Sequence, residues 1–177
     1  MFNSVELLKS KGFVGFYSIK DLQYYRGFVS KERGVYMVLY KGDNRPSFLI
    51  KGTGGCFKGR DKNVPISVLE EKWVNDTIII YIGQAGGIRN GKWSEATLND
   101  RIDAYIRYGM GEDIGHEGGR YIWQIENNEK LELCWKILPN KMANPEEVEC
   151  DMILNFKSIY GRFPFANIKG CRRQARI

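Results

Sequence analysis

The segment from Asn144 to Asn167 predicts a long helix followed by an aromatic turn. Asn144 suits the N-cap, Pro145 suits the first helical position, and acidic residues fill the first turn. Apolar residues then recur with the 3.6-residue period of a helix that buries one face. They are Val148, Met152, Ile153, Phe156, Ile159 and Tyr160. The helix should end at Tyr160 and Gly161, before a return through Phe163-Pro164-Phe165.

One carboxylate, that of Glu149, falls on the same apolar face. A lone buried carboxylate is costly unless a cation or hydrogen-bond donors meet it. Glu146 and Glu147 are explained by their position at the start of the helix, whereas Glu149 is not. The sequence therefore predicts either a metal site or a buried ion pair at Glu149.

Length and composition favour a single domain spanning residues 1–177. The chain is 43% hydrophobic but has no apolar run long enough for a membrane span. Its start lacks a basic region followed by an apolar one, so we expect no signal peptide and a cytoplasmic location. The net charge of +6 is compatible with a polyanionic partner but is too modest to identify one.

The four cysteines are widely separated and form no CxxC pair. We expect free thiols in a reducing compartment, with neither disulfides nor a zinc site. The four are Cys56, Cys134, Cys150 and Cys171.

Two segments rich in β-branched and aromatic residues predict strands. In the first, residues 34–40, pleating should place Val35, Met37 and Leu39 on one face and Tyr36 on the other. The second, residues 77–83, is continuously apolar, which predicts a central strand covered on both faces.

The remaining pattern completes an α+β expectation. Leu98, Ile102, Tyr105 and Ile106 predict the core face of a helix from about Glu95 to Tyr108, with Arg101 at its edge. Residues 120–125 and 131–137 favour a hairpin of two strands. The expected fold is a small, mostly antiparallel central sheet flanked by helices.

Three segments lie outside this pattern: an N-terminal extension (1–33), an insertion (45–76) and a basic tail (169–177). The insertion should contain a short strand at residues 48–50 and a helix at residues 67–73, with Ser67 and Glu70 at capping-box spacing. Its glycines are not followed by GKS or GKT, so a nucleotide loop is not expected. Lys58 and Arg60 fit either a contact with a phosphate backbone or an ordinary basic surface loop.

An ordered set of residues on these elements resembles the GIY-YIG nuclease family. The set is Gly34-Val35-Tyr36, Tyr81-Ile82-Gly83, Arg101, Glu149 and Asn167. In that family two strands carry the tripeptides, one helix an arginine, a later helix a metal-binding glutamate, and a turn an asparagine. Tyr36 and Tyr81 are much farther apart in this sequence than is usual, so the insertion must leave from between two adjacent strands. The segment Gly115 to Arg120 also resembles a bacterial subgroup with such an insertion.

The resemblance implies a metal-dependent nuclease acting on DNA. Glu149 would be the one protein ligand of a Mg²⁺ or Mn²⁺ ion, and Arg101 would bind the scissile phosphate. Tyr36 would act as a general base, with its pKa lowered by Arg101 or the metal, or would position the water. Tyr81 would orient water or phosphate, and Asn167 would hold the site by hydrogen bonding.

Further nucleic-acid contacts are expected from less specific signals. The candidates are Tyr105, His116, Arg120, Lys58 and Arg60. Trp93, Trp123 and Trp135 could stack on bases, although strand tryptophans belong more often to the core. A palindromic target would require a homodimer.

Each candidate also has an ordinary structural explanation. Strand tyrosines are usually core residues, an arginine beside a helix face is usually solvated, and an asparagine in a turn usually caps the backbone. Glu149 could simply pair with Arg101. Only their joint order favours an endonuclease, for which a restriction or defence role is expected, over a catalytically silent nucleic-acid-binding module or a scaffold.

Overall fold

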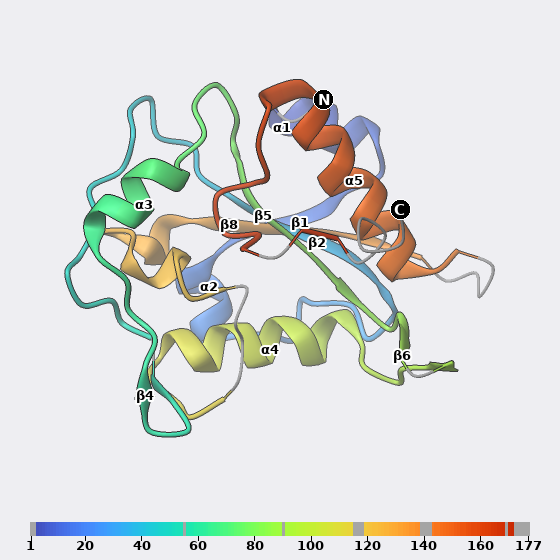
Figure 1. The fold of residues 1–177 in the computed structure, drawn as a ribbon. Coiled ribbons are helices and arrows are strands. Elements are labelled where there is room, and N and C mark those ends of the chain that lie inside the picture. The colour runs from blue at the N-terminus through green and yellow to red at the C-terminus, as the bar shows by residue number, and fades with distance from the viewer. Residues whose placement is uncertain are drawn as a thin grey trace.

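A four-stranded antiparallel sheet in the order β1-β8-β2-β5 forms the centre of the fold (Figure 1). The computed structural model describes residues 3–54, 56–89, 91–114, 119–138, 143–168 and 170–171. The four strands are β1 (Val14–Ser18), β2 (Gly34–Leu39), β5 (Ile79–Ala85) and β8 (Glu132–Ile137). The expected α+β class with a small antiparallel sheet is confirmed.

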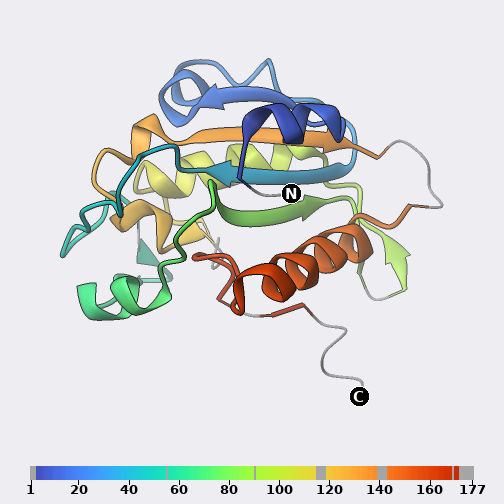
Figure 2. The same ribbon diagram turned by 90° about the horizontal axis from the view of Figure 1, so that it is seen from above.

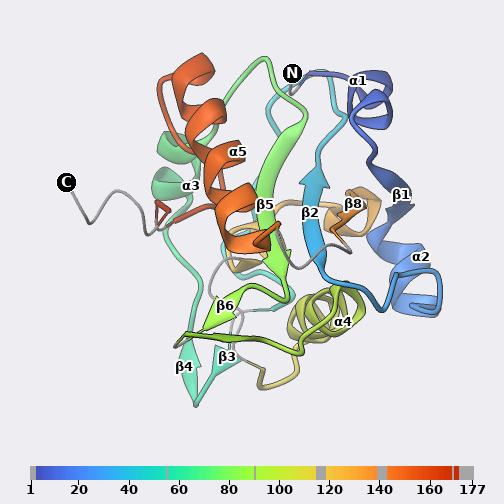
Figure 3. The same ribbon diagram turned by 90° about the vertical axis from the view of Figure 1, so that its right-hand side faces the viewer.

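Helices cover both faces of this sheet (Figures 2 and 3). They are α1 (Val5–Ser10), α2 (Ile19–Tyr24), α3 (Ile66–Lys72), α4 (Leu98–Gly109) and α5 (Pro145–Tyr160). Helices α1 and α5 share one core cluster with Val35 and Met37, whereas α2 and α4 share the other with Tyr36 and Val38. The alternation predicted along β2 is therefore confirmed.

Strands β2 and β5 are adjacent although residues 45–76 separate them in sequence. The insertion leaves the sheet, forms β3 (Cys56–Phe57), β4 (Arg60–Asp61) and α3, and returns. The fully buried Gln124 fastens it to the core: its Nε2 donates to the carbonyl oxygens of Leu49 and Val64, and its Oε1 accepts from the Val64 amide. The predicted adjacency of the two tripeptide strands is confirmed.

The expectation that residues 77–83 form a central strand is wrong, because β2 and β8 are the inner strands and β5 lies at the end of the sheet. Strand β5 is nonetheless buried along nearly its whole length. The turn after α5 lies along its open edge, where the Ala166 amide donates to the Ile80 carbonyl oxygen. The continuous run of apolar residues thus predicted the burial of β5 correctly, but it did not predict the position of this strand in the sheet.

The predicted hairpin of residues 120–125 and 131–137 is also wrong. Residues Ile122–Gln124 form a 3-10 helix, η2, and Asn128–Lys130 form another, η3. Residues 121–125 are all buried, as are those of β2, so burial alone does not distinguish this short helix from a strand. The strand expected at residues 48–50 is reduced to an isolated β-bridge between Phe48 and Ile125.

Three strand pairs were not expected from the sequence, and one of them is the β3–β4 pair of the insertion. The N-terminal extension contributes β1, whose pairing with β8 shifts register between Gly15 and Tyr17, with Phe16 at φ 63°. This bulge interrupts the two-residue period that would have predicted a strand. After β5, strands β6 (Ile88–Arg89) and β7 (Lys92–Trp93) form a short hairpin.

Helix boundaries follow the predicted caps closely at α5 and less closely elsewhere. Asn144 accepts from the Glu146 amide, and Gly161 ends α5 in the left-handed region at φ 73°. Ile159, expected in the core, is exposed. Helix α4 begins at Leu98 rather than near Glu95, because Thr97 and Asp100 form a capping box. The capping box expected at the start of α3 is absent: Pro65 occupies the N-cap.

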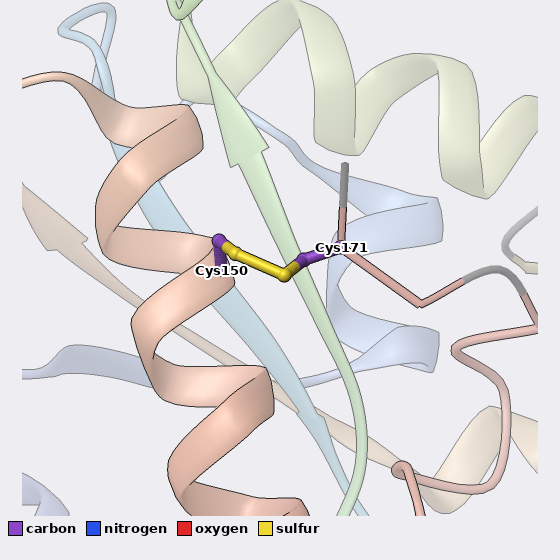
Figure 4. Close-up of a disulfide and its surroundings, with 2 residues drawn as sticks. All are labelled: Cys150 and Cys171. Atoms are coloured by element: carbon purple, nitrogen blue, oxygen red, sulfur yellow. A yellow bond between two sulfur atoms is a disulfide. The ribbon is translucent and has the colours of Figure 1, made fainter. Parts of the chain in front are cut away.

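The cysteine expectation is wrong for one pair. Cys150 on α5 and Cys171 form a disulfide (Figure 4), whereas Cys134 is a free, buried thiol. The turn after α5 brings a cysteine from 21 positions away back beside the helix, which sequence spacing does not reveal. The side chain of Cys56 lies outside the described part of the chain. In the residues described, no helix combines the length and apolarity needed to cross a bilayer.

Candidate active site at the edge of strand β5

Tyr36 and Tyr81 face the same side of the sheet from neighbouring strands. Tyr36 is paired with Gly83, and Val38 with Tyr81, so the two tyrosines are diagonal neighbours. Their ring centroids are 5.9 Å apart, and their hydroxyl groups are hydrogen-bonded to each other. The two tripeptides therefore meet as one pair of phenols.

The glycines of both tripeptides are required by this packing. A Cβ atom on Gly83 would lie 2.5 Å from Cζ of Tyr36, so the ring of Tyr36 occupies the space that a side chain would fill. A Cβ on Gly34 would lie 2.1 Å from the carbonyl oxygen of Lys136 and 3.0 Å from Cδ1 of Leu98. Gly34 thus allows β8 and α4 to pack closely against the start of β2.

Arg101 and Glu149 approach the phenol pair from different helices. Both charges act electrostatically on Tyr36 and on Tyr81. Arg101 is on α4 and Glu149 is on α5, and these helices lie on either side of β5 (Figure 3). Arg101 is exposed and Glu149 is half-buried, so a buried phenol pair lies behind a charged surface that is open to solvent.

The two phenols differ in how readily they ionise. Burial raises the pKa of Tyr36 to about 12, outweighing Arg101 and the hydrogen bond from Tyr81, which both lower it. Burial, the neighbouring Tyr36 and Glu149 raise the pKa of Tyr81 well above its usual value. The hydrogen bond between them favours the charged form of Tyr36 and disfavours that of Tyr81. Arg101 does act to lower the Tyr36 pKa, but the net pKa is raised rather than lowered, because desolvation of a fully buried phenol is the larger effect.

Asn167 completes the edge of the strand that carries Tyr81. Its Oδ1 accepts from the Ile82 amide at 2.9 Å, and its Nδ2 donates to the Ile82 carbonyl oxygen at 2.8 Å. The side-chain amide thus replaces a neighbouring strand. Its contribution to the site is to hold β5 in place.

The expected nucleic-acid contacts have different outcomes. Tyr105 is fully buried against Trp123, with ring centroids 4.8 Å apart, so its expected role as a nucleic-acid contact is wrong. Lys58 and Arg60 are exposed at the β3–β4 turn. The guanidinium of Arg120 lies over the Tyr121 ring, 5.2 Å from its centroid.

The remaining candidates are His116 and three tryptophans. His116 lies outside the described residues. Trp123 and Trp135 are buried, which leaves Trp93 as the half-buried tryptophan among those considered for stacking.

The donor set is compatible with a hard divalent ion held by few protein ligands. Within the described ranges, no group of three or more histidine, cysteine, aspartate or glutamate side chains is arranged to hold a metal. Glu149 is a single carboxylate beside solvent. Mg²⁺ usually keeps several water ligands and needs only one or two carboxylates, so this set fits such an ion.

Sequence reasoning overlooked Arg33, which directly precedes Gly34. Its guanidinium stacks on Trp93, 4.5 Å from the ring centroid, beyond the end of β5. Its position next to the first tripeptide was the available signal.

The comparisons with known proteins do not add to this geometry. No family model matches the chain, and neither a curated protein nor a solved structure matches it. The function therefore has to be argued from the site.

Proposed function

We propose that this protein is a divalent-metal-dependent endonuclease of the GIY-YIG type that hydrolyses phosphodiester bonds in DNA. The observation that carries the proposal is the convergence of one guanidinium and one carboxylate on the same hydrogen-bonded tyrosine pair. These four groups come from two strands and two helices, and they occur in the order found in that family. A pair of core tyrosines would not require opposite charges on both sides.

Each group has a task in phosphodiester hydrolysis. Glu149 would hold Mg²⁺ or Mn²⁺, which supplies an activated water and neutralises charge on the phosphate. Arg101 is exposed, so its planar guanidinium can bind two phosphate oxygens. Tyr81 would donate the hydrogen bond of the pair, which favours negative charge on Tyr36.

DNA is the proposed substrate because the chain is positively charged and presents cations beyond the site. The net charge is +6, and Lys58 and Arg60 are exposed on the β3–β4 turn. Cations on a protruding turn favour contact with the phosphate backbone outside the cleavage position. We propose a restriction or defence role, with a homodimer if the target is palindromic.

The test is cleavage of supercoiled plasmid and short duplexes with Mg²⁺ or Mn²⁺. The decisive variant is Glu149→Gln, and its matched control is Glu147→Gln, an exposed residue in the first turn of the same helix. We expect cleavage by wild type and Glu147→Gln, and a loss of about 10²–10³-fold or more in Glu149→Gln, typical of removing an essential electrostatic group. Equal cleavage by both variants would exclude the proposed metal ligand.

The second candidate is a catalytically silent nucleic-acid-binding module. It is favoured by the complete burial of Tyr36 and the raised pKa of its phenol, because a general base must reach water and release its proton. This candidate predicts DNA binding by wild type without metal-dependent cleavage of any substrate. The plasmid experiment, combined with a binding measurement, separates the two functions.

A further inference from the structure

Arg33 lies where β2 begins and β5 ends. Contacts with neighbouring backbone fix both its main chain and its Cβ atom. Its carbonyl oxygen accepts from the Leu138 amide at 2.9 Å. A Cβ atom on Gly86 would lie 2.6 Å from Cβ of Arg33, so the side chain starts directly against the backbone that follows β5. The direction of the arginine is therefore fixed at its base.

The far end of the side chain is fixed by an aromatic ring. The guanidinium carbon is 4.5 Å from the centroid of the Trp93 ring, on the β6–β7 hairpin. Stacking of this kind engages the face of the guanidinium and leaves the N–H groups at its rim for other acceptors. Trp93 thus orients Arg33 without occupying its hydrogen-bond donors.

Within the described part of the chain, Arg33 has no acceptor that explains its position. Its Nη1 is buried and lacks a hydrogen-bond partner there, and no carboxylate in the described ranges forms an ion pair with it. By contrast, Arg26, Arg45 and Arg107 each pair with a carboxylate. A buried donor without an acceptor is costly in a folded protein, so an incoming anion would satisfy it.

Arg33 also lies between the helices that carry the candidate catalytic charges. The carbonyl oxygen of its neighbour Glu32 accepts from the amide of Leu98, three residues before Arg101. On the other side, a Cβ on Gly87 would lie 3.1 Å from Cβ of Glu146, three residues before Glu149. The start of α5, helix α4 and β6 gather at this end of β5 (Figure 3).

We propose that Arg33, oriented by Trp93, is a second phosphate-binding site, which takes a backbone phosphate next to the one bound at Arg101. The inference rests on the proposed function, because it takes the scissile phosphate to lie at Arg101. Its consequence is a substrate class: a polynucleotide that offers two neighbouring phosphates to the end of β5. A single phosphate monoester would fill only one of the two positions.

The experiment measures binding without cleavage. Fluorescence anisotropy with a labelled 30-base-pair duplex in EDTA gives the dissociation constant of the protein at several KCl concentrations. Each phosphate contact contributes a slope of about −0.9 to the logarithm of affinity against the logarithm of salt concentration. Arg33→Gln should weaken binding about 5–20-fold near 0.1 M salt and reduce the steepness by about one.

Two variants control for charge and for folding. Arg45→Gln removes an arginine that is already paired with Glu70 and should leave the salt slope unchanged. Arg33→Lys keeps the positive charge but not the planar guanidinium. It should therefore keep the salt slope of wild type but bind the duplex less tightly. Thermal unfolding midpoints are measured for every variant, because a purely structural role would lower the midpoint of Arg33→Gln while preserving the slope.

The outcomes separate this inference from the nuclease proposal. A wild-type slope in Arg33→Gln, or no binding of the duplex by wild type, overturns the second phosphate site. A reduced slope supports it, whether or not wild type cleaves plasmid with Mg²⁺. Cleavage by wild type combined with an unchanged slope leaves the nuclease standing and removes Arg33 from its substrate contacts.

Discussion

The ring of Tyr36 lies across Gly83 of the neighbouring strand, in the space where any other residue would place its side chain. The separation from Tyr36 Cζ to a Cβ built on Gly83 would be 2.5 Å, and to one of the ring's Cε atoms 2.7 Å. Packed interiors cannot absorb such an overlap without moving one partner. The glycine of one tripeptide therefore determines where the tyrosine of the other can lie.

This relationship predicts that Gly83→Ala displaces the Tyr36 ring. We expect a loss of stability of about 1–3 kcal/mol, as for other overpacked cores. The cleavage rate should also fall, because the Tyr36 phenol would move away from Tyr81. Urea denaturation measures the first effect and plasmid cleavage the second. The control is a double-mutant cycle: in a Tyr36→Ala background the methyl group at position 83 meets no ring, and its cost should largely disappear.

Alkaline pH should destabilise the fold through its buried phenols. The folded state raises the pKa of Tyr36 from 10.0 to about 12, so folding favours the protonated form. The resulting stability is complete below pH 10 and is lost as pH rises toward 12. For Tyr36 alone the loss is about 3 kcal/mol, at 1.36 kcal/mol per pKa unit. Burial raises the pKa of Tyr81 and Tyr105 as well, which adds to the effect.

The measurement is urea unfolding at intervals between pH 8 and pH 12, followed by circular dichroism. Tyr36→Phe should lose less stability than wild type between pH 10 and pH 12. Tyr24→Phe, which alters a ring that is 94% exposed, should leave it unchanged. If the two variants show the same pH dependence as wild type, the Tyr36 phenol does not contribute to the alkaline transition.

Sequence alone predicted the elements whose signal is local. The alternation along β2, the Asn144 cap and the Gly161 terminus of α5 depend on neighbouring residues, and the structure agrees with all three. The strand predicted at residues 120–125 is wrong because a short apolar segment that is buried on every side fits a helical turn as well as a strand. The bulge at Phe16 hid β1 in a similar way.

The site was predictable only as a set of residues. The order of residues in the sequence indicated Tyr36, Tyr81, Arg101 and Glu149. In the structure, the charges of the last two act on the phenols of the first two. The burial that raises the Tyr36 pKa comes from long-range packing, which local patterns do not report. Arg33 was overlooked for the same reason, since its stacking on Trp93 joins residues 60 positions apart (93 minus 33).

Asn167 should be essential for the edge of β5. Asn167→Ala would remove the side-chain partners of both the Ile82 amide and the Ile82 carbonyl oxygen. Leaving two backbone groups in a buried position without partners should cost about 2–4 kcal/mol. Urea denaturation measures the loss, and Asn75→Ala, at an exposed position, serves as the control. A cost below that of the control would mean that water replaces both hydrogen bonds.

The Cys150–Cys171 disulfide should stabilise the oxidised protein by closing the loop that contains the end of α5 and the turn along β5. The loop spans 21 positions, for which the chain-entropy model gives about 3 kcal/mol. Cys171→Ser should therefore unfold at a lower urea concentration than the oxidised wild type. Adding a thiol reductant should lower the urea midpoint of the wild type to that of the variant. It should leave the midpoint of the variant unchanged. Cys134→Ser, which removes the buried free thiol, should remain sensitive to the reductant, because its disulfide is intact.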